Sequence, residues 1–220
     1  MSIEEIKARF SAAVIDSDRG SIDSILEEFS EQGMRVEEIV FSVIVPFLDS
    51  LTEKLKSGDI TLAQHFVASQ ILGDTVEKFL DSFEKRPESR KTIVLGTAFG
   101  DFHGLGKKIV GGYLMANTFR VVDAGLNVSA ERFVQLALEE DAHIIGVSSM
   151  MVHTATSEEG PAKIRRILKE RGLESSIKLI VGGAPYRYDE QLYARVGADD
   201  WGRSGIEAVE VVKRLLEEVS

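Results

Sequence analysis

Five short apolar runs in the second part of the sequence constrain its fold most strongly. They cover residues 92 to 96, 120 to 125, 144 to 149, 177 to 183 and, more weakly, 198 to 202, and most are separated by a segment long enough for a helix. The runs are continuously apolar, which is typical of strands buried on both faces. The sequence therefore predicts an α/β domain with a parallel sheet, helices on either side, and a ligand site at the carboxyl ends of the strands.

The residues before these runs have a different periodicity. Apolar side chains recur there at the three- and four-residue spacing of amphipathic helices. We expect four helices, the third at about 36 to 57 and the fourth from 61 to about 83, which suffices for a small bundle. A polar stretch with a proline and no apolar periodicity follows. The predicted boundaries are 1 to 84 for a helical domain, 85 to 91 for a linker and 92 to 220 for the α/β domain.

Local signals mark several of the expected helix ends. Ser21 is the expected N-cap of the second helix, and Gly58 is expected to end the third. Thr61 and Gln64 have the spacing of a capping box at the start of the fourth helix. Pro46 lies inside the third helix, where it removes a backbone hydrogen bond and should kink the chain.

Composition excludes several classes of site. The chain contains no cysteine, so a metal ligand must be His, Asp or Glu, or must belong to a cofactor. The formal net charge of −10 disfavours nucleic acid and anionic membranes as partners. The sequence has neither a secretory signal pattern nor an apolar run long enough to span a membrane, so we expect a cytoplasmic protein.

A glycine-rich loop after the first expected strand carries the main candidate site. Asp101 and His103 lie two residues apart in it, with glycines on both sides. Such loops often bind phosphate or a dinucleotide, but the full glycine fingerprint and the Walker spacing are both missing here. The only acidic residue at the end of the second strand is Asp123, immediately before Ala124 and Gly125. The nucleotide interpretation is therefore weak.

Coordination chemistry accounts better for the loop. A histidine that binds a metal through one ring nitrogen usually donates its other N–H to a carboxylate, and Asp101 is placed to accept from His103. The other histidines, His65, His143 and His153, lie in different segments. Too few ligands lie together to hold a bare ion, so the metal would arrive within a macrocycle.

Three motifs, taken in order, resemble the signature of cobalamin-binding proteins. That signature reads D-x-H-x-x-G, then S-x-L, then G-G, at close to the spacings found in this chain. The preceding helices, with the sequence PFLDSLTEKLKSGDITLAQ, are similar to the helical cap of methionine synthase and of the corrinoid proteins of anaerobic methyltransferase systems. The residues that carry the three motifs are Asp101, His103 and Gly106, then Ser148 and Met150, then Gly182 and Gly183.

The resemblance implies a fold and a set of roles. The fold would be a four-helix cap followed by a flavodoxin-like, Rossmann-type, doubly wound sheet of five parallel strands. His103 would bind the cobalt of cobalamin in place of its benzimidazole tail, with Asp101 and Thr154 completing an axial-ligand relay. The displaced tail would enter the sheet near Ser148 and Met150. Glycines would leave room for the cofactor, at Gly100, Gly104 and Gly106 beneath the ring and at Gly182 and Gly183 beside the nucleotide. Two leucines of the cap, Leu55 and Leu62, would shield the upper face.

Some positions admit other interpretations. Met150 stands where the family motif has leucine, which is a conservative apolar exchange. Thr156 or Ser157 could supply the hydroxyl assigned to Thr154, and the two cap leucines could be ordinary bundle core. His65 and His153 are expected to be bystanders, and Lys107 and Lys108 are expected to form a solvated helix face.

The function implied is that of a methyl carrier that is not catalytic alone. The corrinoid would alternate between methylcobalamin and the Co(I) state, receiving a methyl group from a separate donor-specific methyltransferase and giving it to a separate acceptor methyltransferase. A reductive activator of inactive Co(II) is a further expected partner. Methanol, methylamines, betaines and aryl methyl ethers all remain open as donors. The alternatives are a B12-sensing regulatory module, a cobalamin mutase subunit and a flavodoxin-like domain without B12.

Overall fold

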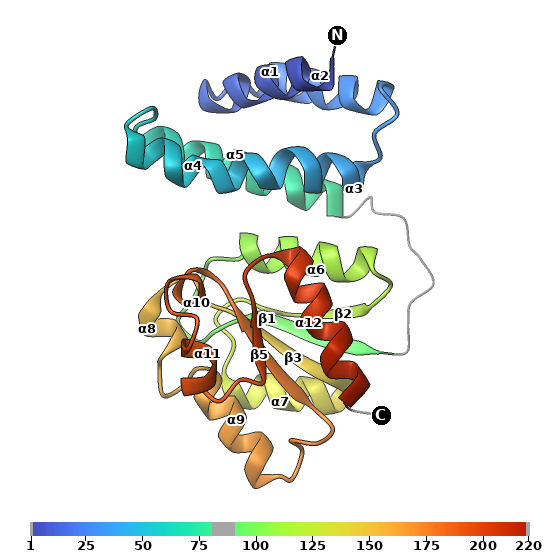
Figure 1. Ribbon diagram of the computed structural model, residues 1–220, viewed down its shortest axis with the longest axis vertical. Helices are drawn as coiled ribbons and strands as arrows, with labels where there is room; N and C mark the ends of the chain where they lie inside the picture. The colour runs from blue at the N-terminus through green and yellow to red at the C-terminus, as the bar shows by residue number, and fades with distance from the viewer. Residues whose placement is uncertain (1, 81–90, 219–220) are drawn as a thin grey trace. The chain divides into compact units, whose positions relative to one another are not determined.

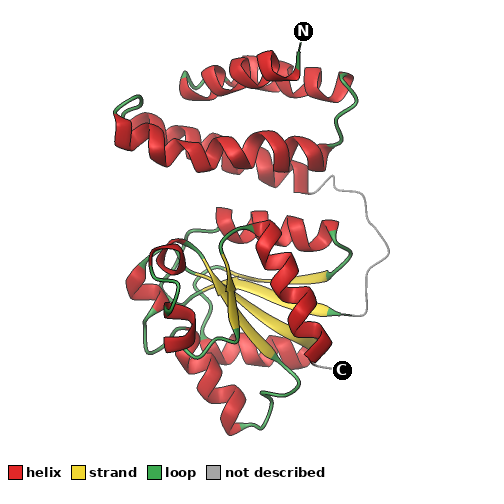
Figure 2. Ribbon diagram, viewed as in Figure 1, coloured by secondary structure: helices red, strands yellow, loops and turns green. Residues whose placement is uncertain are grey.

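The computed structural model describes residues 2 to 80 and 91 to 218, which divide into two compact units. The first unit lies within Met1–Glu84 and the second within Lys85–Ser220. The expected linker at 85 to 91 falls outside the described residues except for Lys91, as does the expected end of the fourth helix near residue 83. Figure 2 shows the first unit as helices and the second as strands covered by helices.

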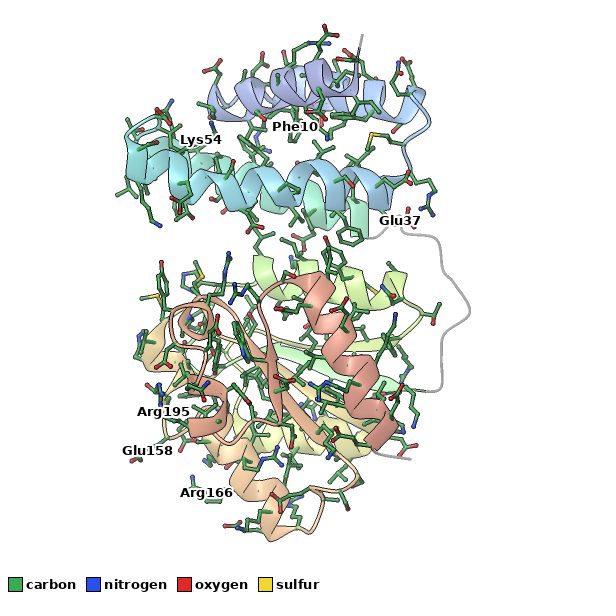
Figure 3. The ribbon with its side chains drawn as sticks, in the orientation of Figure 1. Phe10, Glu37, Lys54, Glu158, Arg166 and Arg195 are labelled. Carbon is green, nitrogen blue, oxygen red and sulfur yellow. The ribbon has the colours of Figure 1, made fainter. Side chains whose placement is uncertain are left out.

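The first unit is helical throughout its regular structure. Phe10 lies at the centre of its core, where its ring meets those of Phe29 and Phe47 edge to face at centroid distances of 6.4 and 6.3 Å. Figure 3 shows Phe10 between the two helical layers of this unit. The elements are α1 (Ile3–Ile15), α2 (Arg19–Glu31), α3 (Val36–Ile39), a π-helical turn η1 (Val40–Ile44), α4 (Val45–Ser57) and α5 (Leu62–Leu80).

Two of the three predicted helix-end signals are confirmed. Gly58 ends α4 in the left-handed conformation, with φ of 82°. Thr61 and Gln64 form the expected capping box, because the Thr61 hydroxyl accepts from the Gln64 N–H and the Gln64 side chain accepts from the Thr61 N–H. The prediction for Ser21 is wrong. Asp18 caps α2, and its carboxylate accepts from the N–H of Ser21 in the first turn.

Pro46 disturbs the third helix through a change of helix type. The turn before it, η1, is a π-helix, and α4 then begins at Val45 with the proline in its first turn. Proline has no N–H to bond the carbonyl four residues earlier, so a widened turn accommodates the missing bond without ending the helix. The chain consequently runs from α3 to α4 as three successive helical segments.

The second unit is built on a five-stranded, all-parallel sheet in the order β2-β1-β3-β4-β5. This confirms the predicted doubly wound fold. All five apolar runs became strands, including the weakest one at the C-terminal end (Figure 1). The strands are β1 (Thr92–Thr97), β2 (Arg120–Gly125), β3 (Ala142–Ser148), β4 (Lys178–Gly182) and β5 (Asp200–Gly202).

Helices cover both faces of this sheet, so its strands are buried on both sides. Helices α6 (Leu105–Ala116) and α12 (Gly205–Glu218) pack on one face over Ile93, Leu95 and Ile144. Helices α7 (Ala130–Glu139) and α9 (Pro161–Glu170) pack on the other face over the alternate strand residues, such as Val94 and Ile145. Figure 1 shows the two helical layers on either side of the strands. Three short helices complete the unit: α8 (Val152–Ala155), α10 (Ala184–Tyr188) and α11 (Leu192–Arg195).

The strand order fixes where a ligand can bind. The connections from β1 go to β2 on one side of the sheet, whereas β3 lies on the other side of β1. The chain therefore reverses its winding between β1 and β3, and the loops at their carboxyl ends open a crevice there. These are the loop with Asp101 and His103, which follows β1, and the loop from Ser149 to Met151, which follows β3.

Candidate functional site

The Asp101 carboxylate is buried in the crevice and holds its loops together. It is 1% exposed, and it accepts four hydrogen bonds from two loops. One oxygen accepts from the backbone N–H of His103 and from its ring Nδ1, both at 2.9 Å. The other accepts from the backbone N–H of Met150 at 2.7 Å and from the Thr154 hydroxyl at 2.8 Å. The carboxylate thus joins the β1 loop to the β3 loop.

This arrangement holds Asp101 ionised. Burial opposes ionisation, but the hydrogen bonds from His103, Met150 and Thr154 outweigh it, so the pKa of Asp101 lies below its ordinary value of 3.8. An ionised acceptor next to Nδ1 requires that nitrogen to carry the ring proton of a neutral imidazole. The unprotonated lone pair of His103 is then on Nε2.

We expect Asp101→Asn to lower the free energy of unfolding by about 2 to 4 kcal/mol at pH 7, because an amide nitrogen must then face donors that the carboxylate accepts from. The folded-state pKa of Asp101 is lowered, so its ionised form stabilises the fold above about pH 4, and this contribution is lost as the pH falls through the folded-state pKa. The difference between wild type and variant should therefore shrink toward pH 3. Urea unfolding of both proteins across this range measures it.

The exposed carboxylate of Asp189, paired with Arg195, offers a matched control. Asp189→Asn makes the same chemical change at the surface and should lower the free energy of unfolding far less than Asp101→Asn does. Equal costs for the two variants would contradict the importance given to the buried network around Asp101.

His103 presents its second nitrogen to solvent. Its side chain is 58% exposed, and within the described residues Nε2 has no hydrogen-bond partner. In the same described ranges no group of three or more His, Asp or Glu side chains is arranged to hold a metal ion. The site therefore offers one well-oriented nitrogen ligand, which suits a metal whose other ligands come with it.

The hydroxyl that meets Asp101 belongs to Thr154. It is 1% exposed, on α8, and it also lies 2.8 Å from the carbonyl of Met151. The two alternatives considered in the sequence have other partners: Thr156 donates to the carbonyl of Val152, and the Ser157 hydroxyl accepts from the N–H of Glu159. Of the three candidates, the structure brings Thr154 to the carboxylate.

The other histidines lie apart from this cluster. His65 is on α5 of the first unit, and His143 is near the amino end of β3, opposite the crevice. Burial lowers the pKa of His143. His153 is exposed on α8, next to Thr154.

The glycines around the crevice differ in what a side chain would meet there. Gly100 has φ of +81°, which a non-glycine residue rarely adopts. A Cβ on Gly104 would lie 3.0 Å from Leu126, and a Cβ on Gly106 would lie 4.0 Å from the hydroxyl of Ser148. The start of α6 therefore passes close to the end of β3, at the position of the predicted cradle.

Gly182 and Gly183 are constrained by the chain itself. A Cβ on Gly182 would lie 3.2 Å from the carbonyl oxygen of Gly202 on β5. A Cβ on Gly183 would lie 2.0 Å from the carbonyl oxygen of Ser149, and the φ of Gly183 is +112°. A side chain at Gly183 would thus clash with the protein itself, and one at Gly182 would be crowded by it, before any ligand is considered.

Lys107 corrects a prediction. It was expected on a solvated helix face, but it is 3% exposed, and its ammonium is paired with Asp123 at the end of β2. It also lies 3.5 Å from the carbonyl of Gly125. The helix start after the Asp-x-His loop is thereby tied to β2, and Asp123, the acidic residue at the end of that strand, is already paired.

Exposed apolar side chains occur in the segments that follow β1, β2 and β3, and the sequence did not predict them. Phe102 is 67% exposed, and Phe99, Leu126, Met151 and Val152 are exposed in the same set of loops, as is the predicted site residue Met150. Large apolar side chains exposed together indicate a surface that another molecule covers.

The first unit also exposes apolar residues. Leu62 and Phe66, one turn apart on α5, are each 70% exposed, whereas Leu55 on α4 is half-buried. The structure thus places the predicted Leu62 on the surface and adds Phe66 beside it. In the described ranges no helix is long and apolar enough to cross a membrane.

Comparison with known proteins places this site in a family. A profile described as "B12 binding domain" matches residues 91 to 210, and a second profile with the same description matches residues 6 to 78. Trimethylamine corrinoid protein 1 of Methanosarcina acetivorans is 31% identical over 98% of this chain and 99% of its own length.

Solved structures show the same fold. The monomethylamine corrinoid protein of Methanosarcina barkeri covers 97% of this chain and is itself covered fully, with a TM-score of 0.81 and 22% identity. A chain of the methanol:cobalamin methyltransferase complex MtaBC, also from Methanosarcina barkeri, aligns over 98% of this chain and 81% of its own length, with a TM-score of 0.53 and 19% identity.

Proposed function

This chain belongs to the B12-binding family of corrinoid proteins, and we propose that it is the methyl carrier of a methylamine methyltransferase system, with His103 as the axial ligand to cobalt. One observation carries the ligand assignment: His103 is exposed, with Nδ1 fixed on a buried carboxylate and Nε2 directed to no protein partner within the described residues. The methylamine donor is proposed because relatives that match this chain almost from end to end are trimethylamine and dimethylamine corrinoid proteins.

The residues of the crevice fit a cobalamin. The donor set is a single neutral imidazole, which suits a metal already held by four nitrogens of a macrocycle. Gly104 and Gly106 carry no side chain beside His103, which leaves the backbone there open to the approach of a flat ring. Ser148 ends β3 opposite Gly106, so its hydroxyl is our candidate partner for the displaced benzimidazole, with Met150 beside it and Gly182 and Gly183 near the nucleotide.

When bound, the corrinoid supplies a cobalt atom that accepts a methyl group from one partner and yields it to another. The protein's residues orient that chemistry. Asp101 fixes the tautomer and the plane of His103, and Thr154 and Met150 hold Asp101. The lowered pKa of Asp101 keeps its carboxylate ionised, so it continues to accept from the ring Nδ1 of His103.

Apolar side chains on α5 supply a candidate shield. Leu62 and Phe66 expose a surface that costs free energy in water, and it is suited to the upper face of the macrocycle. Leu55, half-buried within the bundle, is proposed to contribute from α4. The role of these residues stays a prediction.

Separate proteins are proposed to load and unload the carrier. They are a methyltransferase specific for the amine, a methyltransferase for the acceptor, and a reductive activator that restores inactive Co(II). The identity of the acceptor is left open.

Loading the purified chain with hydroxocobalamin tests the proposal. We expect one corrinoid per chain after removal of the free cofactor, and demethylation of trimethylamine when a trimethylamine methyltransferase is added. A parallel assay with methanol and its methyltransferase should give a rate at least about tenfold lower. Failure to retain any corrinoid would reject the carrier function, and equal rates with both donors would reject the methylamine assignment.

A further inference from the structure

We propose that Asn127 is a positioning residue for the axial ligand, an inference that rests on the proposed role of His103. Asn127 lies in the loop between β2 and α7 and touches neither His103 nor the Asp101 carboxylate in the contacts described above. It acts on the backbone of the Asp-x-His loop instead. Neither the family motifs nor the relay of Asp101 and Thr154 includes it.

Three hydrogen bonds connect Asn127 to that loop and to the end of β1. Its side-chain oxygen accepts from the N–H of Gly100 at 2.7 Å. Its own N–H lies 3.0 Å from the carbonyl oxygen of Asp101 and 2.9 Å from the hydroxyl of Thr97. The Thr97 hydroxyl in turn donates to the same Asp101 carbonyl at 2.7 Å. Asn127 and Thr97 together close a latch, which we define as these two residues, around the backbone of residues 100 and 101.

The conformation of Asn127 explains the choice of residue. Its φ is +53°, in the left-handed region that asparagine tolerates better than most side chains. Gly100, the residue that it grips, has φ of +81°. The adjacent Leu126 lies against Gly104, so the same loop supports the Asp-x-His segment on both sides of His103.

The latch complements the grip on the carboxylate. Met150 and Thr154, after β3, hold the side chain of Asp101, whereas the latch, from the β1 and β2 side, holds its backbone. A carboxylate held at its oxygens alone leaves the backbone free to pivot about that point. His103 is attached to this backbone, so a pivot there would move Nε2 along and across the direction of the metal bond.

Three asparagine variants and one reference variant, His103→Ala, test the inference. Asn127→Gly permits the left-handed backbone and removes the side chain, and with it the oxygen that accepts from Gly100. Asn127→Asp restores an acceptor for Gly100 and should rescue. Asn117→Gly removes an asparagine at the far end of α6, where its side chain bonds Tyr113 and Lys213, and controls for the loss of an asparagine as such. His103→Ala supplies the spectrum without the ligand.

The readout is the electron paramagnetic resonance spectrum of each protein loaded with cob(II)alamin, in which a coordinated nitrogen splits the cobalt signal. We expect Asn127→Gly to lower the ratio of nitrogen-coordinated to uncoordinated protein about fivefold, as for the loss of one hydrogen bond. Asn127→Asp and Asn117→Gly should retain the wild-type ratio. In the cofactor-free protein, amide exchange at Gly100 should quicken about tenfold in Asn127→Gly alone.

The outcomes separate the two proposals. A wild-type spectrum identical to that of His103→Ala would reject His103 as the ligand, and this inference with it. A distinct His103→Ala spectrum, with Asn127→Gly matching wild type, would overturn the positioning role alone. If Asn127→Gly does not fold, Thr97→Val, which removes the buried hydroxyl without changing the side-chain shape, carries the same test and the same expected loss of nitrogen coordination.

Discussion

Replacing His103 by alanine should remove nitrogen coordination from the bound corrinoid while leaving the corrinoid on the protein. Among the described residues around Asp101, Nε2 of His103 is the nitrogen that faces solvent, and we propose it as the metal ligand. Retention of the cofactor is expected to depend instead on the crevice at the ends of β1 and β3. We expect the visible spectra of the Co(II) and Co(III) forms to shift to those of a corrinoid without imidazole. Methyl transfer from the amine-specific methyltransferase should fall roughly 100-fold or more, since even residues that only support a metal ligand are worth 10- to 100-fold.

His153 provides the matched control for this variant. It is an exposed histidine on α8, next to Thr154, and His153→Ala makes the same deletion within the same group of loops. Its spectra and transfer rate should equal those of wild type. Loss of nitrogen coordination in His153→Ala would contradict the assignment of His103 as the ligand. Retention of nitrogen coordination in His103→Ala would contradict it as well.

The fold of the second unit was predictable because its signal is repeated and local. Each strand is a short apolar run, and continuous apolar character carries the information that both faces are buried. Even the weak run around Trp201 became a strand. It pairs with the edge of β4, whose backbone hydrogen-bonding groups would otherwise lack a strand partner on that side. Helix ends were less certain. Asp18 and Ser21 are both good capping residues three positions apart, and only the structure shows that the first is the cap and the second its partner.

In the candidate site, too, contacts between residues close in the sequence could be predicted, and contacts between distant residues could not. Asp101 and His103 are two residues apart, so their hydrogen bond could be predicted from the spacing. The choice of Thr154 over Thr156 depended on how α8 turns after β3, which no spacing specifies. Lys107 carried no local sign of burial, because its partner Asp123 belongs to a neighbouring strand and reaches it only after the sheet forms.

Substitution of Gly183 by alanine should destabilise the second unit by about 3 kcal/mol or more. Its φ of +112° and ψ of −177° lie in a region that is open almost only to glycine, and an added Cβ would meet the carbonyl oxygen of Ser149 at 2.0 Å. That carbonyl belongs to the backbone, and the N–H of Ser149 donates a hydrogen bond to the carbonyl of Gly182 on β4. Moving either Ser149 or Gly183 would therefore strain the backbone. Urea unfolding of the cofactor-free protein measures the cost.

Gly172, at the end of α9, separates conformation from contact. Its φ is +68°, and an added Cβ would meet nothing within 4 Å, so Gly172→Ala should cost only about 1 kcal/mol. The comparison also decides why Gly183 is needed. If the glycine only made room for a cofactor, Gly183→Ala would weaken cobalamin binding and leave the unfolding of the cofactor-free protein unchanged. We expect instead that Gly183→Ala destabilises the cofactor-free protein, because the clash with Ser149 exists without a cofactor. Any loss of cobalamin binding would then follow from the distorted junction of β3 and β4.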